Sequence, residues 1–343
     1  MTDVKSMNLS ELTDYITSNG FERFRAKQIL DWIKRDAHSF DDMTNIPAKL
    51  RNFLKADAYL ASAEIVRAQH SRIDDTVKYL YKLFDGEYVE GVLMSYHHGR
   101  TICISTQVGC KMGCTFCATG KSGFSRSLTA SEMVAQIRSA ETDCSERISN
   151  VVLMGMGEPF DNYDNVIRFL RLVSSEDSLN IGMRHITVST CGIVPRMYEF
   201  ADLKLQCGLS VSLHAPDDES RSRTMPINRR YPVAEVIRAS RYYTEKTGRR
   251  ITFEYALIDS VNDSDETARS LAALLKGMLC HVNLIPVNNV TGAGYKKSSL
   301  KRQKVFVDIL SAHGINATVR RTLGSDIDAS CGQLRRKYTK GDA

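Results

Sequence analysis

Six short, apolar, β-rich runs recur through the middle and end of this chain, and no other feature constrains its fold as strongly. The runs are TICIST (101–106), NVVLMG (150–155), RHITVST (184–190), GLSVSLH (208–214), RITFEYAL (250–257) and CHVNLIP (280–286). The segments between them are long enough for crossover helices, which parallel strands require. Six such units are too few to close an eight-stranded barrel, so we predict an α/β fold built on a partial (βα)6 barrel.

The first sixty residues have a helical period instead. Ser10 can cap a helix that stops near Gly20, and FRAKQILDWIKR (24–35) places apolar residues on one helical face. Pro47 opens a third short helix. We therefore predict a small helical accessory domain over residues 1–75.

A different pattern follows in TVKYLYKLFDGEYVEGVLMSY (76–96), which reads as a β-hairpin that turns at Asp85-Gly86. The hairpin precedes the first of the six runs. We predict a second domain over residues 76–343, in which this hairpin leads into the partial barrel and a C-terminal extension follows it. Side chains that act on a substrate should gather at the C-terminal ends of the barrel strands.

The composition limits where such a protein works. The 343 residues are 43% hydrophobic, with no apolar run of eighteen residues and no apolar core of a signal peptide near the N-terminus. We expect a cytoplasmic monomer with no membrane association. In a reducing compartment nine cysteines are a poor disulfide framework, so clustered cysteines indicate a metal or redox chemistry.

The basic residues gather in the C-terminal third of a chain whose net charge is +6. They form five clusters: Arg229-Arg230, Lys296-Lys297, Lys301-Arg302 with Lys304, Arg320-Arg321, and Arg335-Arg336-Lys337. Such clusters favour a phosphate-rich partner.

Three cysteines stand close together in CKMGCTFC (110–117), at a C-x3-C-x2-C spacing that is hard to attribute to accident. A structural zinc site would need a fourth ligand, and the nearest candidates, Cys103 and Cys144, lie on a predicted strand and in a helical segment. Three thiolates on a four-iron cluster leave one iron open to another ligand. An open position of this kind indicates catalysis.

Cys110, Cys114 and Cys117, with Phe116 before the last, resemble the [4Fe-4S] cluster motif of radical S-adenosylmethionine (SAM) enzymes, in which SAM binds the open iron. The resemblance then narrows to the ribosomal and transfer RNA adenine-C2 methyltransferases. It is carried, in order and spacing, by FRAKQILDWI, STQVGCKMGCTFCATGKSGFSRSLTASEM, VVLMGMGEPFDNYDNV, ITVST, SLHAPDDESR, MPINRRYP, VNLIPVN and SDIDASCGQL. It covers nearly the whole chain. Departures are slight: Cys191, Asn289 and Ser330 replace the residues usual at those positions.

The resemblance implies a set of SAM contacts. Gly157 and Glu158 match the strip that holds the SAM amino group, and the other matching positions are Ser189, Ser212, Leu213, His214 and Asn288. Without the resemblance, Glu158 would be read as a helix cap after a tight turn, and His214 as a core histidine.

Three further residues match catalytic positions of the family. Cys331 resembles the cysteine that takes a methyl group from a first SAM, Cys103 its resolving partner, and Glu90 the general base. On their own, the two cysteines would be read as inert buried thiols and Glu90 as a solvated strand residue.

The implied substrates are 23S rRNA and also tRNA, methylated at adenine C2, whose hydrogen is neither acidic nor nucleophilic. A radical made from a second SAM takes hydrogen from the methyl group on Cys331, and the resulting carbon adds to C2. Loss of an electron, and of the C2 proton to Glu90, leaves a thioether that joins Cys331 to the base. Cys103 then attacks the Cys331 sulfur, which releases the product and leaves a Cys103–Cys331 disulfide. An electron donor such as flavodoxin or ferredoxin is implied.

Two alternatives remain at this point. Close relatives that share these motifs methylate adenine at C8, although Pro159 and the Asn162-Tyr163-Asp164-Asn165 stretch favour the C2 group. In a non-catalytic iron–sulfur RNA-binding protein the cluster would be scaffolding, and Glu90, Cys103 and Cys331 would have no purpose.

Overall fold

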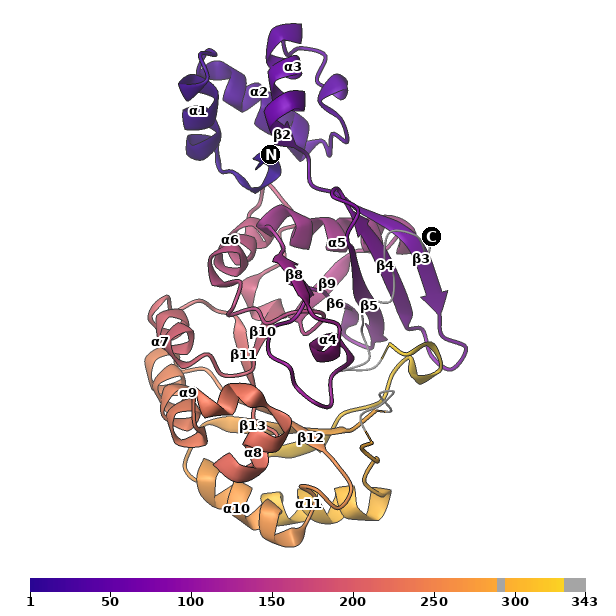
Figure 1. The fold of residues 1–343 in the computed structure, drawn as a ribbon, viewed down its shortest axis with the longest axis vertical. Coiled ribbons are helices and arrows are strands. Elements are labelled where there is room, and N and C mark those ends of the chain that lie inside the picture. The colour runs from indigo at the N-terminus through magenta and orange to yellow at the C-terminus, as the bar shows by residue number, and fades with distance from the viewer. Residues whose placement is uncertain (289–293, 330–343) are drawn as a thin grey trace.

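The computed structural model describes residues 1–288 and 294–329. Its centre is a ten-stranded sheet with the strand order β14-β13-β12-β11-β10-β9-β6-β5-β4-β3 (Figure 1). The strands from β6 to β14 pair in parallel, whereas β3, β4, β5 and β6 pair in antiparallel. The sheet curves around an interior, as a partial barrel does.

The parallel part confirms the predicted barrel, since each predicted run overlaps one strand. The strands are β6 (Gly99–Cys103), β9 (Ile148–Leu153), β10 (Ile186–Thr190), β11 (Gly208–Ser212), β12 (Ile251–Leu257) and β13 (Cys280–Pro286). A seventh parallel strand, β14 (Ala317–Val319), pairs with β13 and was not predicted. Three residues are too few to show a strand period.

The antiparallel part contains the predicted hairpin, formed by β4 (Val77–Leu83) and β5 (Tyr88–Tyr96). An additional strand, β3 (Ala63–His70), pairs with β4. It lies within residues 1–75, which we assigned to the helical domain, and it was not predicted. As an edge strand β3 is mostly half-exposed, and it therefore lacks the apolar run that marks the other strands.

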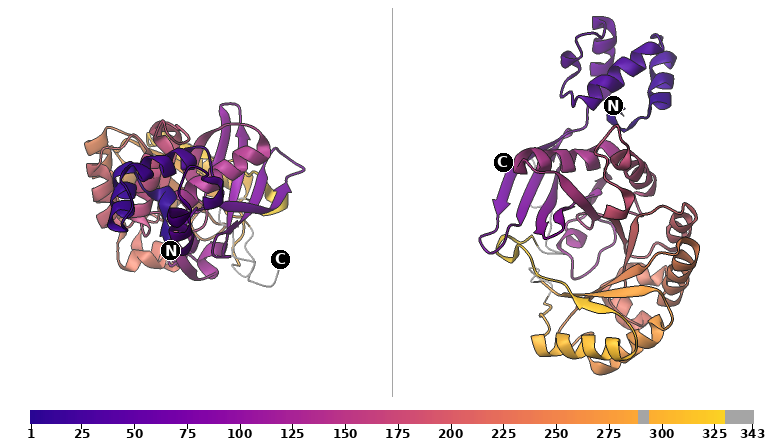
Figure 2. Two further views of the ribbon diagram at one scale, coloured as in Figure 1. Left: turned by 90° about the horizontal axis from the view of Figure 1, so that it is seen from above. Right: turned by 180° about the vertical axis from the view of Figure 1, so that it is seen from behind.

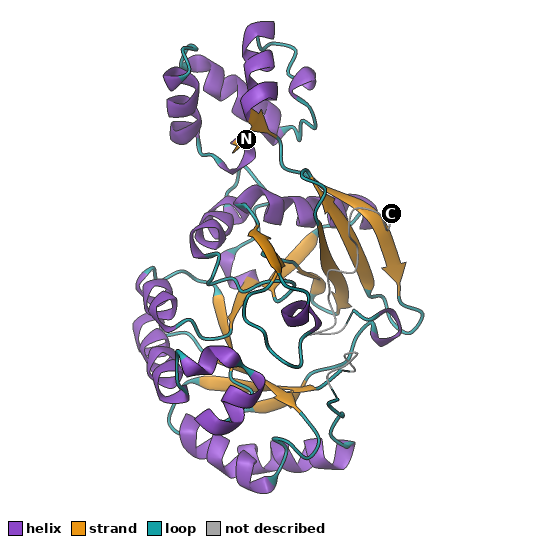
Figure 3. Ribbon diagram, viewed as in Figure 1, coloured by secondary structure: helices purple, strands orange, loops and turns teal. Residues whose placement is uncertain are grey.

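Helices cover the outside of the curved sheet, and the short α4 (Ala118–Lys121) lies within its opening (Figure 3). The other helices of the barrel are α5 (Ala130–Cys144), α6 (Tyr163–Ser174), α7 (Val194–Asp202), α8 (Asp218–Thr224), α9 (Val233–Thr247), α10 (Asp265–Leu275) and α11 (Leu300–Ala312). None of the helices in the described ranges has the length and apolar character needed to cross a membrane.

Side chains alternate between the two faces of the parallel strands. On β11, the buried Leu209 and Val211 belong to the hydrophobic core, whereas Ser210 shares a register position with Thr252 of β12. The next inward positions pair Glu254 of β12 with Asn283 of β13. The inner face of the barrel is therefore polar, which suits a binding site better than a packed core.

The N-terminal helices project beyond one end of the barrel (Figure 2). They are α1 (Leu9–Ser18), α2 (Phe24–Lys34) and α3 (Ala48–Asp57), and they enclose a separate hydrophobic core between Val4 and Ala58. Asn8, not Ser10, caps α1, because Asn8 forms a capping box with Glu11. The division of the chain into two domains stays a prediction.

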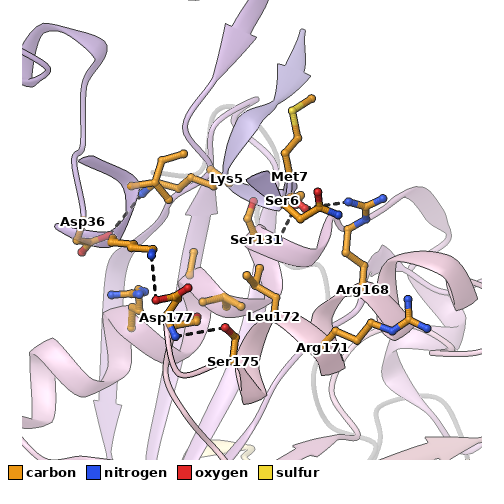
Figure 4. A pocket seen from close by; sticks show the side chains of 18 of the residues that line it. Lys5, Ser6, Met7, Asp36, Ser131, Arg168, Arg171, Leu172, Ser175 and Asp177 are labelled. Atoms are coloured by element: carbon orange, nitrogen blue, oxygen red, sulfur yellow. Dashed lines mark hydrogen bonds and ion pairs between the residues drawn. The ribbon is translucent and has the colours of Figure 1, made fainter. Parts of the chain in front are cut away.

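A cavity of about 1210 Å³ lies between these helices and the barrel helices α5 and α6 (Figure 4). Its lining mixes acidic and basic side chains. Arg168 of α6 donates to both carboxylate oxygens of Glu11, at 2.5 and 2.7 Å, and Lys34 lies 2.9 Å from Asp177. Charge pairs thus connect the helical segment to the barrel across this cavity.

Candidate active site

One cavity of about 150 Å³ at the C-terminal ends of the parallel strands brings together nine of the predicted site residues. They are Cys110, Cys114, Cys117, Gly157, Glu158, Ser189, Ser212, His214 and Asn288. These residues are spread over 179 positions of the sequence, so their meeting at one place follows from the parallel topology.

The cysteine loop lies between β7 (Gln107–Gly109) and α4. Its backbone is tightly wound, since a Cβ on Gly120 would lie 2.9 Å from the carbonyl oxygen of Cys114. Burial raises the pKa of the Cys110 thiol to about 12 and that of Cys114 higher still. A metal ion deprotonates such thiols outright when it binds them. Three thiols on one loop beside an open cavity suit an iron–sulfur cluster.

Among the described residues no three His, Cys, Asp or Glu side chains form a recognisable site for a metal ion. The role of Cys110, Cys114 and Cys117 as cluster ligands therefore stays a prediction.

Gly157 and Glu158 follow β9 at the cavity wall. Gly157 has a φ of +106°, and a Cβ there would lie 2.6 Å from the Cβ of Gln107, so only glycine fits. The buried carboxylate of Glu158 accepts hydrogen bonds from the backbone N–H groups of Phe160 (2.9 Å) and Cys191 (2.8 Å). Burial raises the pKa of Glu158. A buried carboxylate at the cavity wall is the kind of group that an ammonium group would require.

His214 is held in a single protonation state. Its Nδ1 accepts a hydrogen bond from the backbone N–H of Ala256 at 2.8 Å, which leaves the proton on Nε2. Burial lowers the pKa of His214 to about 3, so the ring is neutral at physiological pH. The backbone of His214 has a φ of +59°, a left-handed conformation that costs free energy in a non-glycine residue. Such conformations cluster at functional sites. The ring of Phe116 packs edge-on against it, at 4.7 Å between centroids.

Leu213 is the one predicted SAM contact in this group that does not line the cavity. Its side chain is fully buried in the hydrophobic core. Its N–H donates to the carbonyl of Glu254, and its own carbonyl accepts from Nε of Arg221. Leu213 therefore separates Ser212 from His214 along the chain, while its own side chain packs into the hydrophobic core and not into the cavity.

Comparison with known proteins agrees with this geometry. The model of the Radical SAM superfamily matches residues 104–272, and that of the ribosomal RNA large subunit methyltransferase N-terminal domain matches residues 2–60. A relative from Alkaliphilus oremlandii, named "Probable dual-specificity RNA methyltransferase RlmN", is 54% identical over 98% of both chains. The chain belongs to the RlmN family of radical SAM RNA methyltransferases.

Other relatives support the same placement. The RlmN relative from Clostridium tetani is 51% identical over 100% of this chain and 98% of its own. The crystal structure of a radical SAM methyltransferase from Sphaerobacter thermophilus is 46% identical, with a TM-score of 0.89, and covers 98% of this chain and 100% of its own. As a member of the RlmN family, this protein is a radical SAM enzyme that methylates RNA.

Glu90 and Cys103, the other predicted catalytic residues, lie outside the cavity on the neighbouring strands β5 and β6. Cys103 shares a register position with Val92, so Glu90, two residues from Val92, points to the same face of the sheet. The carboxylate of Glu90 is buried and lies 2.8 Å from Nζ of Lys78. Read alone, Glu90 was expected to be solvated, and that expectation is wrong: the inner face of the barrel encloses it.

Cys331 lies outside the described residues, but the segment that leads to it is well anchored. Asp326 accepts hydrogen bonds from the hydroxyl of Ser71 at 2.7 Å and from the N–H of Arg72 at 2.8 Å. Nζ of Lys78 donates to the carbonyl of Asp328 at 3.3 Å. The segment therefore reaches the same strands that carry Glu90.

Sequence reasoning missed several residues of this region. Lys78 and Glu254 are charged side chains inside otherwise apolar strands, and that interruption of the pattern was the available signal. Glu254 lines the cavity and accepts from Ser210 at 3.2 Å and Asn283 at 2.8 Å, while burial raises its pKa. Cys191, to which the sequence analysis gave no role in the site, also lines the cavity.

The predicted basic clusters differ in whether their side chains are exposed or are engaged in contacts within the protein. Arg229, Arg230 and Lys297 are exposed, but Arg302 is engaged by Asp265 at 2.5 Å and by the carbonyl of Asp263. The cluster from Arg335 to Lys337 lies outside the described residues.

Proposed function

We propose that this protein methylates C2 of adenosine in 23S rRNA and in tRNA. The observation that carries the proposal is the layout of one curved sheet: its parallel strand ends hold the three-cysteine cavity, and its adjoining antiparallel strands hold Glu90 and Cys103. Family membership supplies the RNA substrate class. Such RNAs are met in the cytoplasm.

In this proposal Cys110, Cys114 and Cys117 hold a [4Fe-4S] cluster, and the other polar residues of the cavity position SAM. When bound, the two supply the one-electron chemistry that an unactivated C–H bond requires. Glu158 pairs with the SAM ammonium group, and the neutral ring of His214 donates a hydrogen bond to SAM from Nε2. Ser189, Ser212 and Asn288 provide further polar contacts from neighbouring strand ends.

Glu90, Cys103 and Cys331 act on the RNA. Cys331 carries the methyl group and becomes joined to the base through its sulfur; Glu90 accepts the C2 proton. The thiolate of Cys103 then attacks the Cys331 sulfur; the bond from that sulfur to the transferred carbon breaks, the carbon takes up a proton to become the methyl group, and a Cys103–Cys331 disulfide remains to be reduced. An external donor, such as flavodoxin or ferredoxin, supplies electrons. The anchoring of Asp328 by Lys78 supports this assignment, because it draws the Cys331 segment toward Glu90.

The product of the reaction tests the regiochemistry. We expect mass spectrometry of nucleosides from 23S rRNA and tRNA, treated with the reconstituted protein, to show 2-methyladenosine. Formation of 8-methyladenosine instead would overturn the proposed position of attack. A Cys117→Ala protein is expected to lose iron and to leave both RNAs unmodified.

The order of events is tested by two cysteine variants. Cys103→Ala should stall with RNA attached through Cys331, because the earlier steps do not need the resolving thiol. Cys331→Ala should attach no RNA. Cys207→Ala, which removes a buried thiol remote from these strands, is the control and should turn over normally. Normal turnover by Cys103→Ala would exclude the resolving role.

A further inference from the structure

Arg221 of α8 is a fully buried arginine whose side chain holds together several turns at the mouth of the barrel. Its Nε donates to the carbonyl of Leu213 at 3.0 Å. Its Nη2 donates to the carbonyls of Cys191 at 2.7 Å and Ser212 at 3.0 Å. Its Nη1 donates to the side-chain oxygen of Asn228 at 2.9 Å and, less closely, to the carbonyl of Tyr231 at 3.4 Å.

The strand ends that Arg221 joins are those that carry predicted SAM contacts. Cys191 follows β10, two residues after Ser189, and its N–H donates one of the two backbone hydrogen bonds that Glu158 accepts. Ser212 ends β11, immediately before Leu213 and His214. The guanidinium of Arg221 carries a rigid, planar set of N–H donors, here called its fork. The fork therefore fixes the distance between the ends of β10 and β11 at the cavity, which a single ammonium group cannot do.

The same helix also holds the cysteine loop. The carbonyl of Thr224, at the end of α8, accepts a hydrogen bond from the N–H of Thr115 at 3.0 Å. Thr115 directly follows Cys114 and precedes Cys117 by two positions. Arg221 and Thr224 are thus parts of one short helix that touches both the cysteine loop and the strand ends opposite it.

The charge of Arg221 bears on the thiols as well as on the backbone. All five acceptors named above are neutral oxygens, four from the backbone and one from the Asn228 side chain, so these bonds solvate the guanidinium without cancelling its charge. Its Nη2 lies 2.7 Å from the carbonyl oxygen of Cys191, and Cys191 lines the same cavity as the three cysteines, so the positive charge lies beside the proposed cluster site. In a buried site such an interaction is much stronger than in water.

We propose that Arg221 is a positioning residue of the SAM and cluster site, with two separable effects. Its fork holds the ends of β10 and β11 in the arrangement that binds SAM, and its positive charge favours the reduced state of a cluster held by Cys114. The inference rests on the proposed function, because that function places the cluster and SAM in this cavity.

Two substitutions separate the fork from the charge. Arg221→Lys keeps the cation and loses the fork, whereas Arg221→Met loses both. The measurements are iron content, SAM affinity by equilibrium dialysis, and the midpoint potential of the cluster by an anaerobic titration followed by electron paramagnetic resonance without SAM. Arg223→Met is the matched control, since Arg223 lies on the same helix, is exposed and contacts only Glu219 among the ion pairs of the described residues.

We expect Arg221→Lys to bind SAM about tenfold or more weakly, as expected for the loss of hydrogen bonds to buried carbonyls, and to keep a near-native potential. Arg221→Met should show the same weak binding of SAM together with a more negative midpoint potential, because a cluster without a nearby positive charge takes up an electron less readily. Arg223→Met should leave both quantities unchanged.

A purely structural Arg221 would give a different result. Both variants would then unfold at lower temperature while their folded, iron-loaded fractions kept native SAM affinity and potential, and this outcome would overturn the inference. If Arg221→Met fails to fold, a native SAM affinity in Arg221→Lys overturns it equally. Failure of the proposed function is distinguishable, because native protein would then hold no cluster or bind no SAM before any variant is compared.

Discussion

Lys78 and Glu90 form a buried ion pair on the two strands of one hairpin, with 2.8 Å between Nζ and Oε1 and side chains only 7% and 5% exposed. Lys78 also donates to the carbonyl of Asp328. The carboxylate that we propose as the base is therefore fixed in place by an ammonium group that simultaneously holds the segment leading to Cys331.

Replacing Lys78 with Met should destabilise the protein by about 3 kcal/mol, because it removes the ammonium group that is paired with the buried carboxylate of Glu90. Urea unfolding measures the change. Lys82→Met on the same strand is the control, since Lys82 is exposed and its loss should cost under about 0.5 kcal/mol. Equal small losses for the two variants would show that the pair contributes little.

The buried His214 predicts a pH dependence of stability. Its folded pKa of about 3 lies below its ordinary value of 6.5, so the unfolded chain takes up the proton first as the pH falls. The stability that this residue contributes is complete above pH 6.5 and decreases toward pH 3. Between pH 7.5 and 5.5 the native protein should lose about 1.4 kcal/mol more than His214→Asn does.

Urea titrations at the two pH values measure this difference, and the exposed His313 provides a control: His313→Asn should follow the native protein. If native protein and His214→Asn lost the same stability, His214 would not be the neutral buried ring described above.

Gly157→Ala should destabilise the protein by about 2–4 kcal/mol and weaken SAM binding, because the new Cβ meets Gln107 and the backbone has a positive φ. Gly277→Ala separates the two causes. Gly277 also has a positive φ, of +73°, but its Cβ would enter open space, so we expect a loss of only about 1 kcal/mol. Thermal unfolding and equilibrium dialysis with SAM check both variants.

Arg168→Ala should loosen the helical segment from the barrel without unfolding either. The Arg168–Glu11 pair is more than one third exposed, so we expect under about 1 kcal/mol of lost stability. Limited proteolysis of the connection around residues 60–62 should become faster, and RNA should bind more weakly. Arg171→Ala, on the same helix, is the control. Unchanged cleavage and RNA affinity would show that this pair does not orient the segment.

Most of the barrel could be predicted from sequence, because its parallel strands are continuous apolar runs between helical segments. The hairpin was equally visible through Asp85-Gly86. Two edge strands could not be predicted, because each is defined mainly by its pairing with one neighbour: β3 pairs with β4, and β14 with β13. Neither strand has enough apolar residues to show a period by itself.

The residues of the candidate site, like the strands, were predicted from the sequence only in part. Motif spacing and resemblance located the cysteines, Glu158 and His214, which the cavity then brought together. Arg221 was missed because nothing in its sequence context indicates burial, and Lys78 was missed although its place among apolar residues of a strand was a signal. Their partners are mainly backbone carbonyls or a single carboxylate on another element, and only the folded chain shows them.

The hydrogen bond between Ser71 and Asp326 spans 255 residues of sequence. During synthesis on the ribosome, β3 and β4 therefore emerge long before the segment that anchors to the turn between them. The nascent chain can complete most of the barrel while this anchor is still missing. Cys331, which follows the anchor in the sequence, is synthesised later still, so a half-made chain cannot begin the proposed methyl transfer.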